Sequence, residues 1–166
     1  MDLDNMNVDD FLKKNEEAKQ ENGQPEKTLE QRFAEERSLW TNKIQTMSSK
    51  MQNVFKVSEL LTDIYTERQI AVEYYHLLLT ALSKVTKIYR KQWSEKYDHY
   101  SYHSQKRFPN ERTKELQILS DIGDIVEKRE LIDGHLKFIN NTINTIDNLI
   151  YGIKYKVEIE QISRGR

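Results

Sequence analysis

The sequence lacks cysteine altogether and is poor in the residues that make turns. Its 166 residues contain 5 glycines and 2 prolines, whereas 32% are charged. Without cysteine the chain can form no disulfide, thiolate nucleophile or zinc–thiolate site. A sheet protein would need more turn residues, so the composition predicts an all-α fold of long helices in a hairpin or coiled-coil arrangement.

Long hydrophobic runs are lacking as well. No apolar stretch approaches the roughly 18 residues that a membrane-spanning helix needs. The beginning of the chain is acidic and contains no apolar core of a secretory signal. We therefore expect a cytoplasmic protein without a membrane partner.

The motifs of common catalytic and cofactor sites are absent too. The scattered glycines form neither a P-loop nor a dinucleotide-binding fingerprint. His99 and His103 have the i,i+4 spacing of two metal ligands, but no third ligand and no HExxH context accompany them. Surface side chains, or protonatable groups beside a phosphate, explain these histidines better. We predict no enzymatic activity, no cofactor and no metal.

What the chain does have is segregated charge. Residues 1–38 carry eleven acidic and six basic residues, a balance of −5. From Lys84 to Lys114, nine basic residues face three acidic ones, a balance of +6, and aromatic rings are interleaved with them. Cations attract a phosphate backbone and flat rings stack on unpaired bases, so this stretch favours binding of single-stranded nucleic acid.

The pattern along the chain predicts a short tail and one helical domain. Residues 1–27 read as an acidic, disordered tail, and the alternative is that Val8, Phe11 and Leu12 form a short amphipathic segment that folds onto a partner. The domain, residues 28–166, is expected to contain a helix over 28–54, a long helix over 58–103, a loop over 104–112 and a second long helix over 113–162. Thr28 and Gln31 have the spacing of a capping box, and Ser58 is the expected cap of the long helix.

Isoleucine dominates the last helix at alternating spacings of three and four residues, which is typical of a coiled-coil seam. Isoleucine at both seam positions disfavours parallel dimers and favours larger assemblies. We therefore predict a homo-oligomer whose interface contains Ile132, Leu136, Ile139, Ile143, Ile146, Ile150, Ile153 and Val157. The alternative is that this seam packs within the monomer against the long helix over 58–93. The glycines of this segment weaken a helix, so one of them could mark a bend.

The aromatic residues divide into two groups. Tyr89 and Trp93 continue an apolar seam and are expected to pack, whereas the rings beyond them could meet bases. The predicted nucleic-acid-binding residues are Arg90, Lys91, Lys96, Tyr97, Tyr100, Lys106, Arg107 and Arg112. The basic face could instead pair with the acidic N-terminal region, which would then compete with nucleic acid.

The run Ser94-Glu95-Lys96-Tyr97-Asp98-His99-Tyr100, the segment Glu115–Asp121 and the helix Phe138–Lys156 with its basic end follow one another in an order that resembles the UvsY family of tailed-phage recombination mediators. The resemblance covers roughly residues 60–162. It implies a ring-like hexamer or heptamer that binds single-stranded DNA and helps load a RecA-like recombinase onto DNA covered by single-strand binding protein. For a phage-encoded chain, the location would be the host cytoplasm.

Two other functions fit parts of the pattern. An oligomeric coiled-coil scaffolding or assembly protein of a phage would share the isoleucine seam, but it would not require the basic stretch. Binding of duplex DNA or RNA by the same basic stretch is the other alternative, and competition with duplex would separate it from single-strand binding because stacking requires unpaired bases.

Overall fold

The computed structural model describes residues 27–51 and 57–165, and this part of the chain is all helical, without a strand. Its elements are α2 (Leu29–Lys50), α3 (Val57–Asp98), one π-helical turn (His99–His103), α4 (Glu111–Asp121) and α5 (Gly123–Arg164). The predicted all-α fold is thus confirmed. None of these helices is long and apolar enough to cross a membrane. The predicted tail up to residue 26 and the predicted helix end at 52–54 lie outside the described residues.

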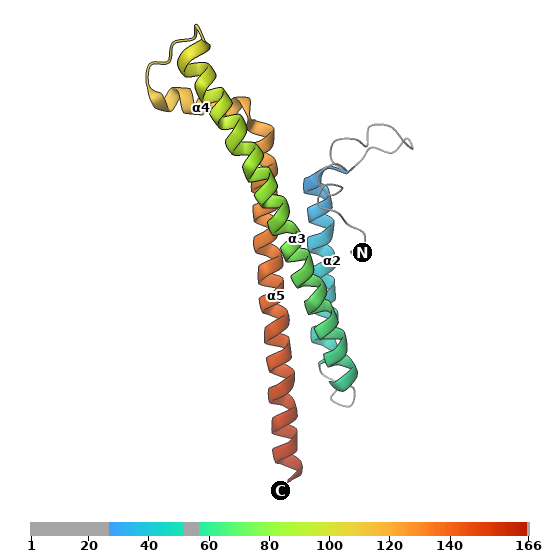
Figure 1. Cartoon of the computed structure of the whole chain (residues 1–166). Helices are drawn as coiled ribbons and strands as arrows, with labels where there is room; N and C mark the ends of the chain where they lie inside the picture. The colour runs from blue at the N-terminus through green and yellow to red at the C-terminus, as the bar shows by residue number, and fades with distance from the viewer. Residues whose placement is uncertain (1–26, 52–56, 166) are drawn as a thin grey trace.

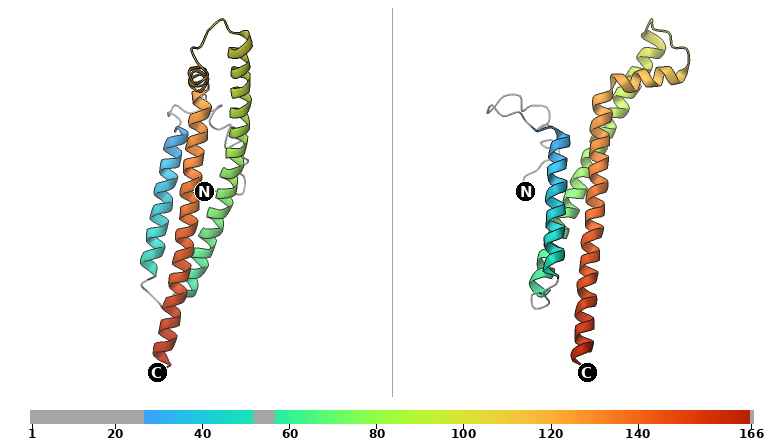
Figure 2. Two further views of the ribbon diagram at one scale, coloured as in Figure 1. Left: turned by 90° about the vertical axis from the view of Figure 1, so that its left-hand side faces the viewer. Right: turned by 180° about the vertical axis from the view of Figure 1, so that it is seen from behind.

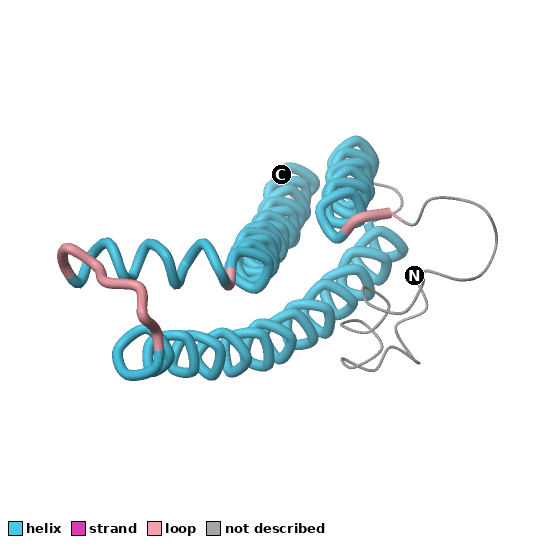
Figure 3. The backbone as a smooth tube through the Cα atoms, turned by 90° about the horizontal axis from the view of Figure 1, so that it is seen from above, coloured by secondary structure: helices cyan, strands magenta, loops and turns pink. Residues whose placement is uncertain are grey.

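α3 and α5 form a long antiparallel hairpin, and α2 lies beside one half of it (Figure 1). α2 runs parallel to α5, and the C-terminal end of α5 extends past the other two helices (Figure 2). Arg68 of α3 joins the pair laterally, with its Nε 2.6 Å from Oδ1 of Asp147. α4 leaves the axis of the hairpin and lies across its end (Figure 3).

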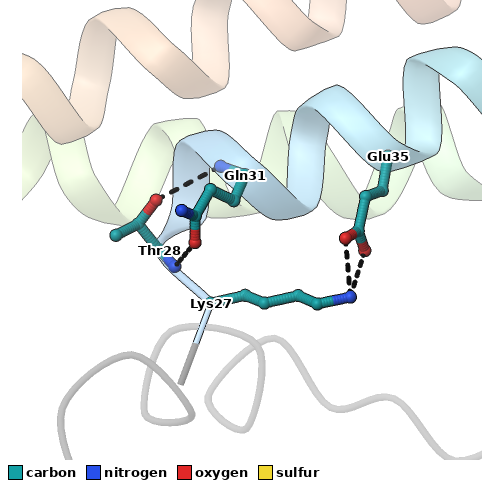
Figure 4. A network of polar contacts seen from close by, with 4 residues as sticks. All are labelled: Lys27, Thr28, Gln31 and Glu35. Carbon is teal, nitrogen blue, oxygen red and sulfur yellow. Dashed lines mark hydrogen bonds and ion pairs between the residues drawn. The ribbon is translucent and has the colours of Figure 1, made fainter. Parts of the chain in front are cut away.

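The start of α2 is fixed by its own side chains. The Thr28 hydroxyl accepts a hydrogen bond from the Gln31 backbone N–H at 3.2 Å, and the Gln31 side chain accepts one from the Thr28 N–H at 3.0 Å (Figure 4). This reciprocal pair satisfies two amides that have no partner within the helix, so the predicted capping box is confirmed. The buried residues of α2 are spaced by seven, which leaves one line of apolar contact with the hairpin: Phe33, Trp40 and Met47.

The isoleucine seam of α5 packs inside the chain, which is the alternative that the sequence left open. Six of the eight predicted interface residues are buried and the other two are partly buried against the same core; the eight are Ile132, Leu136, Ile139, Ile143, Ile146, Ile150, Ile153 and Val157. Their neighbours in that core include Ile64, Leu78 and Val85 of α3. An interface between copies through these side chains would therefore have to displace α2 or α3.

The predicted helix over 113–162 is wrong in one respect, because the structure divides it into α4 and α5. Ile122 leaves the helical conformation, with φ −109° and ψ 22°, and Gly123 begins the next helix. Ile118 and Ile122 are nonetheless buried. Buried residues at this spacing fit a straight helix and a corner equally well, which is why periodicity could not reveal the break.

The boundaries of the other elements also shift. α3 begins at Val57, so Ser58 lies within the helix rather than capping it, and α3 ends at Asp98 before the π-helical turn. The loop covers residues 104–110, because Asn110 caps α4 by accepting a hydrogen bond from the Thr113 N–H at 2.9 Å. Asparagine is among the preferred residues for this role, and its side chain sets the first turn of α4 two residues earlier than predicted.

Candidate nucleic-acid interface

The basic, aromatic stretch forms the projecting end of the molecule. We call the π-helical turn, the loop and α4 together, residues 99–121, the arm (Figure 1). The arm extends sideways from the point where α3 ends and α5 begins. Most of the predicted nucleic-acid-binding residues lie on the arm or on the last turns of α3 that support it.

Tyr100 attaches the arm to the corner between α4 and α5. Its hydroxyl donates a 2.5 Å hydrogen bond to Oδ2 of Asp121, and its ring meets Phe108 edge-on with centroids 5.2 Å apart. The hydrogen bond raises the pKa of Tyr100 above its usual value. The same hydrogen bond, followed by one from the Gln117 amide, lowers the pKa of Asp121. Tyr100 is therefore engaged within the chain.

Tyr97 has a similar structural role. The Lys114 ammonium lies 4.1 Å from the centroid of its ring and 3.0 Å from Oε1 of Glu111. Glu111 raises the pKa of Lys114, and Lys114 in turn lowers the pKa of Glu111. The predicted stacking residues Tyr97 and Tyr100 thus pack within the arm and its base. The spacing of residues in the sequence could not predict these contacts, because their partners lie on another helix.

The exposed ring of the arm belongs to Tyr102, which is 78% exposed. Tyr102 is one of the rings beyond Trp93 that the sequence suggests could meet bases, although it is not among the predicted nucleic-acid-binding residues given above. Tyr89 and Trp93 are half-buried, as expected, and Arg129 of α5 lies 4.5 Å from the centroid of the Tyr89 ring. Among the tyrosines of the arm, Tyr102 is the one with a face open to a ligand.

The six predicted cations fall into two groups. Lys96 lies 3.5 Å from Asp121, Lys106 donates a 2.7 Å hydrogen bond to Gln117, and the exposed Lys91 lies 3.8 Å from Glu95. The second group consists of three exposed arginines: Arg90, Arg107 and Arg112. Their guanidinium groups have no hydrogen bond or ion pair with any described residue. Of the six predicted cations, these arginines are the most available to a phosphate.

A groove of about 630 Å³ runs along α3 before the arm, lined by Leu79, Leu82, Ser83, Thr86, Lys87 and Arg90. One end of the groove is apolar and the other is basic. A second hollow, of about 500 Å³, lies where α3 meets the α4–α5 corner and contains Glu95, Lys96, His99 and Asp121. Among the described residues no group of three or more histidines and acids could hold a metal ion.

The structure also contains a buried polar cluster that sequence reasoning missed. Glu36 of α2 accepts hydrogen bonds from the Tyr74 hydroxyl and from Nε2 of His135, the latter at 2.9 Å. His135 is fully buried, stacks on Phe33 with centroids 4.1 Å apart, and its Nδ1 has no hydrogen-bond partner. Burial, then the neighbouring Glu36 carboxylate, raises the pKa of Tyr74 far above its usual value.

A period of seven along α5 could have revealed this cluster. His135 and Thr142 are buried, Leu149 packs against the same core, and Lys156 donates a hydrogen bond to the Met51 carbonyl at 2.8 Å. These positions form a line beside the isoleucine seam, and the line faces α2.

The chain was also compared with known proteins. No protein-family model, no curated protein and no solved structure matches it.

Proposed function

We propose that this protein is a non-enzymatic, single-stranded DNA-binding recombination mediator that helps load a RecA-like recombinase onto DNA covered by single-strand binding protein. The observation that carries the DNA-binding part is the position of Arg90, Arg107 and Arg112, which are exposed and have no partner among the described residues. The exposed ring of Tyr102 lies on the same arm. The loading role and a hexameric or heptameric ring are supported by the sequence resemblance.

The arm would bind DNA in two ways. Guanidinium groups hydrogen-bond phosphate oxygens in a planar, bidentate manner, so the three arginines would follow the backbone of the strand. An aromatic face can stack on any unpaired base, so Tyr102 would add affinity without sequence preference. In an assembly, each copy would add one such patch, and avidity would rise without any new contact.

The test is a fluorescence-anisotropy titration of labelled poly-dT at low and moderate salt. Replacing Arg90, Arg107 and Arg112 with alanine should weaken binding. It should also flatten the salt dependence by about 2 units, because each phosphate contact on a single strand contributes about 0.7. Excess duplex should not displace the bound strand.

The control removes the same charge elsewhere. Lys137, Lys154 and Arg164 are exposed on α5, away from the arm, so the triple alanine variant at these positions should keep the affinity and the salt slope. Equal losses in both variants would show a general charge effect and contradict a site at the arm. If the protein does not bind poly-dT even at low salt, an assembly or scaffolding role becomes the better proposal.

A further inference from the structure

We propose that the N-terminal segment Val8–Leu12 docks in the groove of α3 described above and covers Lys87 and Arg90. This contact lies within one chain and does not depend on the proposed DNA binding. The occupant is a segment of this protein that precedes the described residues, and the argument rests on chemistry, position and reach.

The groove combines an apolar floor with free positive charge. Leu79 is 43% exposed, whereas its neighbour Leu78 is completely buried, so Leu79 lies on the outer face of α3. Lys87 and Arg90 line the other end of the groove, and neither has a partner among the described residues. An occupant that matches both ends needs apolar side chains together with carboxylates.

The segment Val8–Leu12 has this composition. Val8, Phe11 and Leu12 are spaced i, i+3, i+4, so they would share one face if the segment forms a helical turn on docking, and Asp9 and Asp10 lie between them in the sequence. Residues 1–26 carry eight acidic and three basic residues, a balance of −5. Within that region this is the segment where three bulky apolar side chains flank two adjacent carboxylates.

The structure places the start of α2 level with the groove along the helix axis, while the groove itself lies on the outer, exposed face of α3. Two contacts set the antiparallel alignment of α2 and α3, namely Lys43 with Glu67 and, one heptad along, Glu36 with Tyr74. One further heptad places Leu29 level with Ala81, which is buried on the inner face of α3 at the height of Leu79 and Leu82. The chain therefore enters α2 at the height of the groove.

The connection is also long enough. Residues 13–26 separate the segment from Lys27. Fourteen residues can span up to about 50 Å when extended, whereas the groove from Leu79 to Arg90 is only about 17 Å long at 1.5 Å per helical residue. The remaining length of about 30 Å is enough for the connection to pass around α3 to its outer face, and when the segment is seated there Arg90 is covered.

Paramagnetic relaxation in the full chain tests the contact. Because the chain has no cysteine, a single introduced cysteine gives a unique attachment point for a nitroxide. Ser94→Cys lies on the exposed surface one turn beyond Arg90, and Glu158→Cys lies on the far end of α5 and serves as the control. We expect strong loss of the amide signals of residues 8–12 with the first label and no loss with the second.

Two double variants test the two sides of the proposed contact. Phe11→Ser with Leu12→Ser should restore the amide signals with the Ser94 label, and so should Lys87→Ala with Arg90→Ala on the groove side. Both variants change residues outside the described core, so the fold is preserved. Persistent signal loss in these variants, or equal loss from both labels, overturns the proposal. Signal loss that occurs between separate copies in a mixed sample also overturns it, because the occupant would then be a second molecule.

Discussion

Lys114 of α4 lies over the ring of Tyr97 of α3, with its Nζ 4.1 Å from the ring centroid. The same ammonium is paired with Glu111 and donates a 3.1 Å hydrogen bond to the Ser101 hydroxyl. Only 12% of the Lys114 side chain is exposed, although the residue belongs to a highly basic stretch. This lysine holds α4 against α3 and is not a free cation of the surface.

Replacing Lys114 with methionine should therefore loosen the arm while leaving the hairpin intact. Methionine keeps the apolar stem but loses the ammonium that contacts Tyr97, Glu111 and Ser101. We expect faster hydrogen exchange of the α4 amides and unchanged exchange in the core of α5. Lys137→Met, at an exposed position of α5, is the control. Unchanged α4 exchange would contradict the anchoring role of Lys114.

The contact between Tyr100 and Asp121 should depend on pH at both ends of the scale. The pKa of Asp121 lies below its ordinary 3.8, so its contribution to stability is present above that value and lost as pH falls through the lowered pKa. The pKa of Tyr100 lies above its ordinary 10.0, so its contribution is present below that value and lost as pH rises through the raised pKa. In a carbon-detected NMR titration, Tyr100→Phe should move the pKa of Asp121 upward. An unchanged pKa would show that Gln117 and Lys96 suffice.

The buried cluster around Glu36 should contribute strongly to stability. Tyr74→Phe removes one hydrogen bond to a charged acceptor and should cost about 1.5–3 kcal/mol. His135→Ala removes a fully buried ring and also leaves Glu36 with one donor fewer, so we expect a loss of about 3 kcal/mol or more. Urea unfolding measures both effects. His76→Ala, at an exposed position, should stay within about 0.5 kcal/mol.

The sequence predicted the helices of this fold well because heptad spacing and caps are local signals. The Thr28 cap and the buried line of isoleucines both followed from a few neighbouring residues. Spacing could not decide whether the seam of α5 packs against α3 of the same chain or against another copy, because both kinds of contact require the same pattern of apolar side chains. The corner at Ile122 was hidden for a related reason, since burial continues through it.

Tyr102 should contribute to DNA binding if its exposed ring stacks on a base. Tyr102→Ala is then expected to weaken poly-dT binding by about 1–3 kcal/mol with little change in salt slope, because stacking does not depend on counterion release. Tyr65, which is 48% exposed on α3 away from the arm, provides a matched control. Equal affinities of the Tyr102→Ala and Tyr65→Ala variants would argue against stacking at the arm.

Self-association remains a prediction, and the structure changes which residues should be tested. The last turns of α5 expose large apolar side chains by 60–68%: Tyr151, Tyr155, Ile159 and Ile162. We expect Ile159→Ser with Ile162→Ser to lower the mass measured by sedimentation velocity while the helical circular dichroism is kept. Leu39→Ser with Ile88→Ser, at exposed positions elsewhere, is the control. If the double α5 variant keeps the mass of the wild type, this end of α5 is not the interface.

The candidate site was predicted only in part. The sequence located the cations and rings correctly in one region, but it could not separate those that build the arm from those that remain open. Lys96, Tyr97 and Tyr100 have partners that are distant in the sequence or in another helix, Asp121 and Lys114, so their roles depend on tertiary structure. His135 was missed because the period of seven beside the isoleucine seam was overlooked, and because its partners Glu36 and Tyr74 are distant in the sequence.

The partial coverage of the hairpin by α2 has a mechanical consequence. α2 accompanies α3 from Asp63, which pairs with Lys50, to about Ala81, which is level with Leu29, so the remainder of α3 toward the arm is a two-helix ribbon. That ribbon extends about 26 Å, at 1.5 Å for each residue from Ala81 to Asp98, and a tilt of roughly 10° at its base would move its tip by about 4 Å. Two helices bend more easily than three, so the molecule combines a stiff base with a compliant lever. The arm sits at the tip of that lever, where small deflections of the base are amplified most.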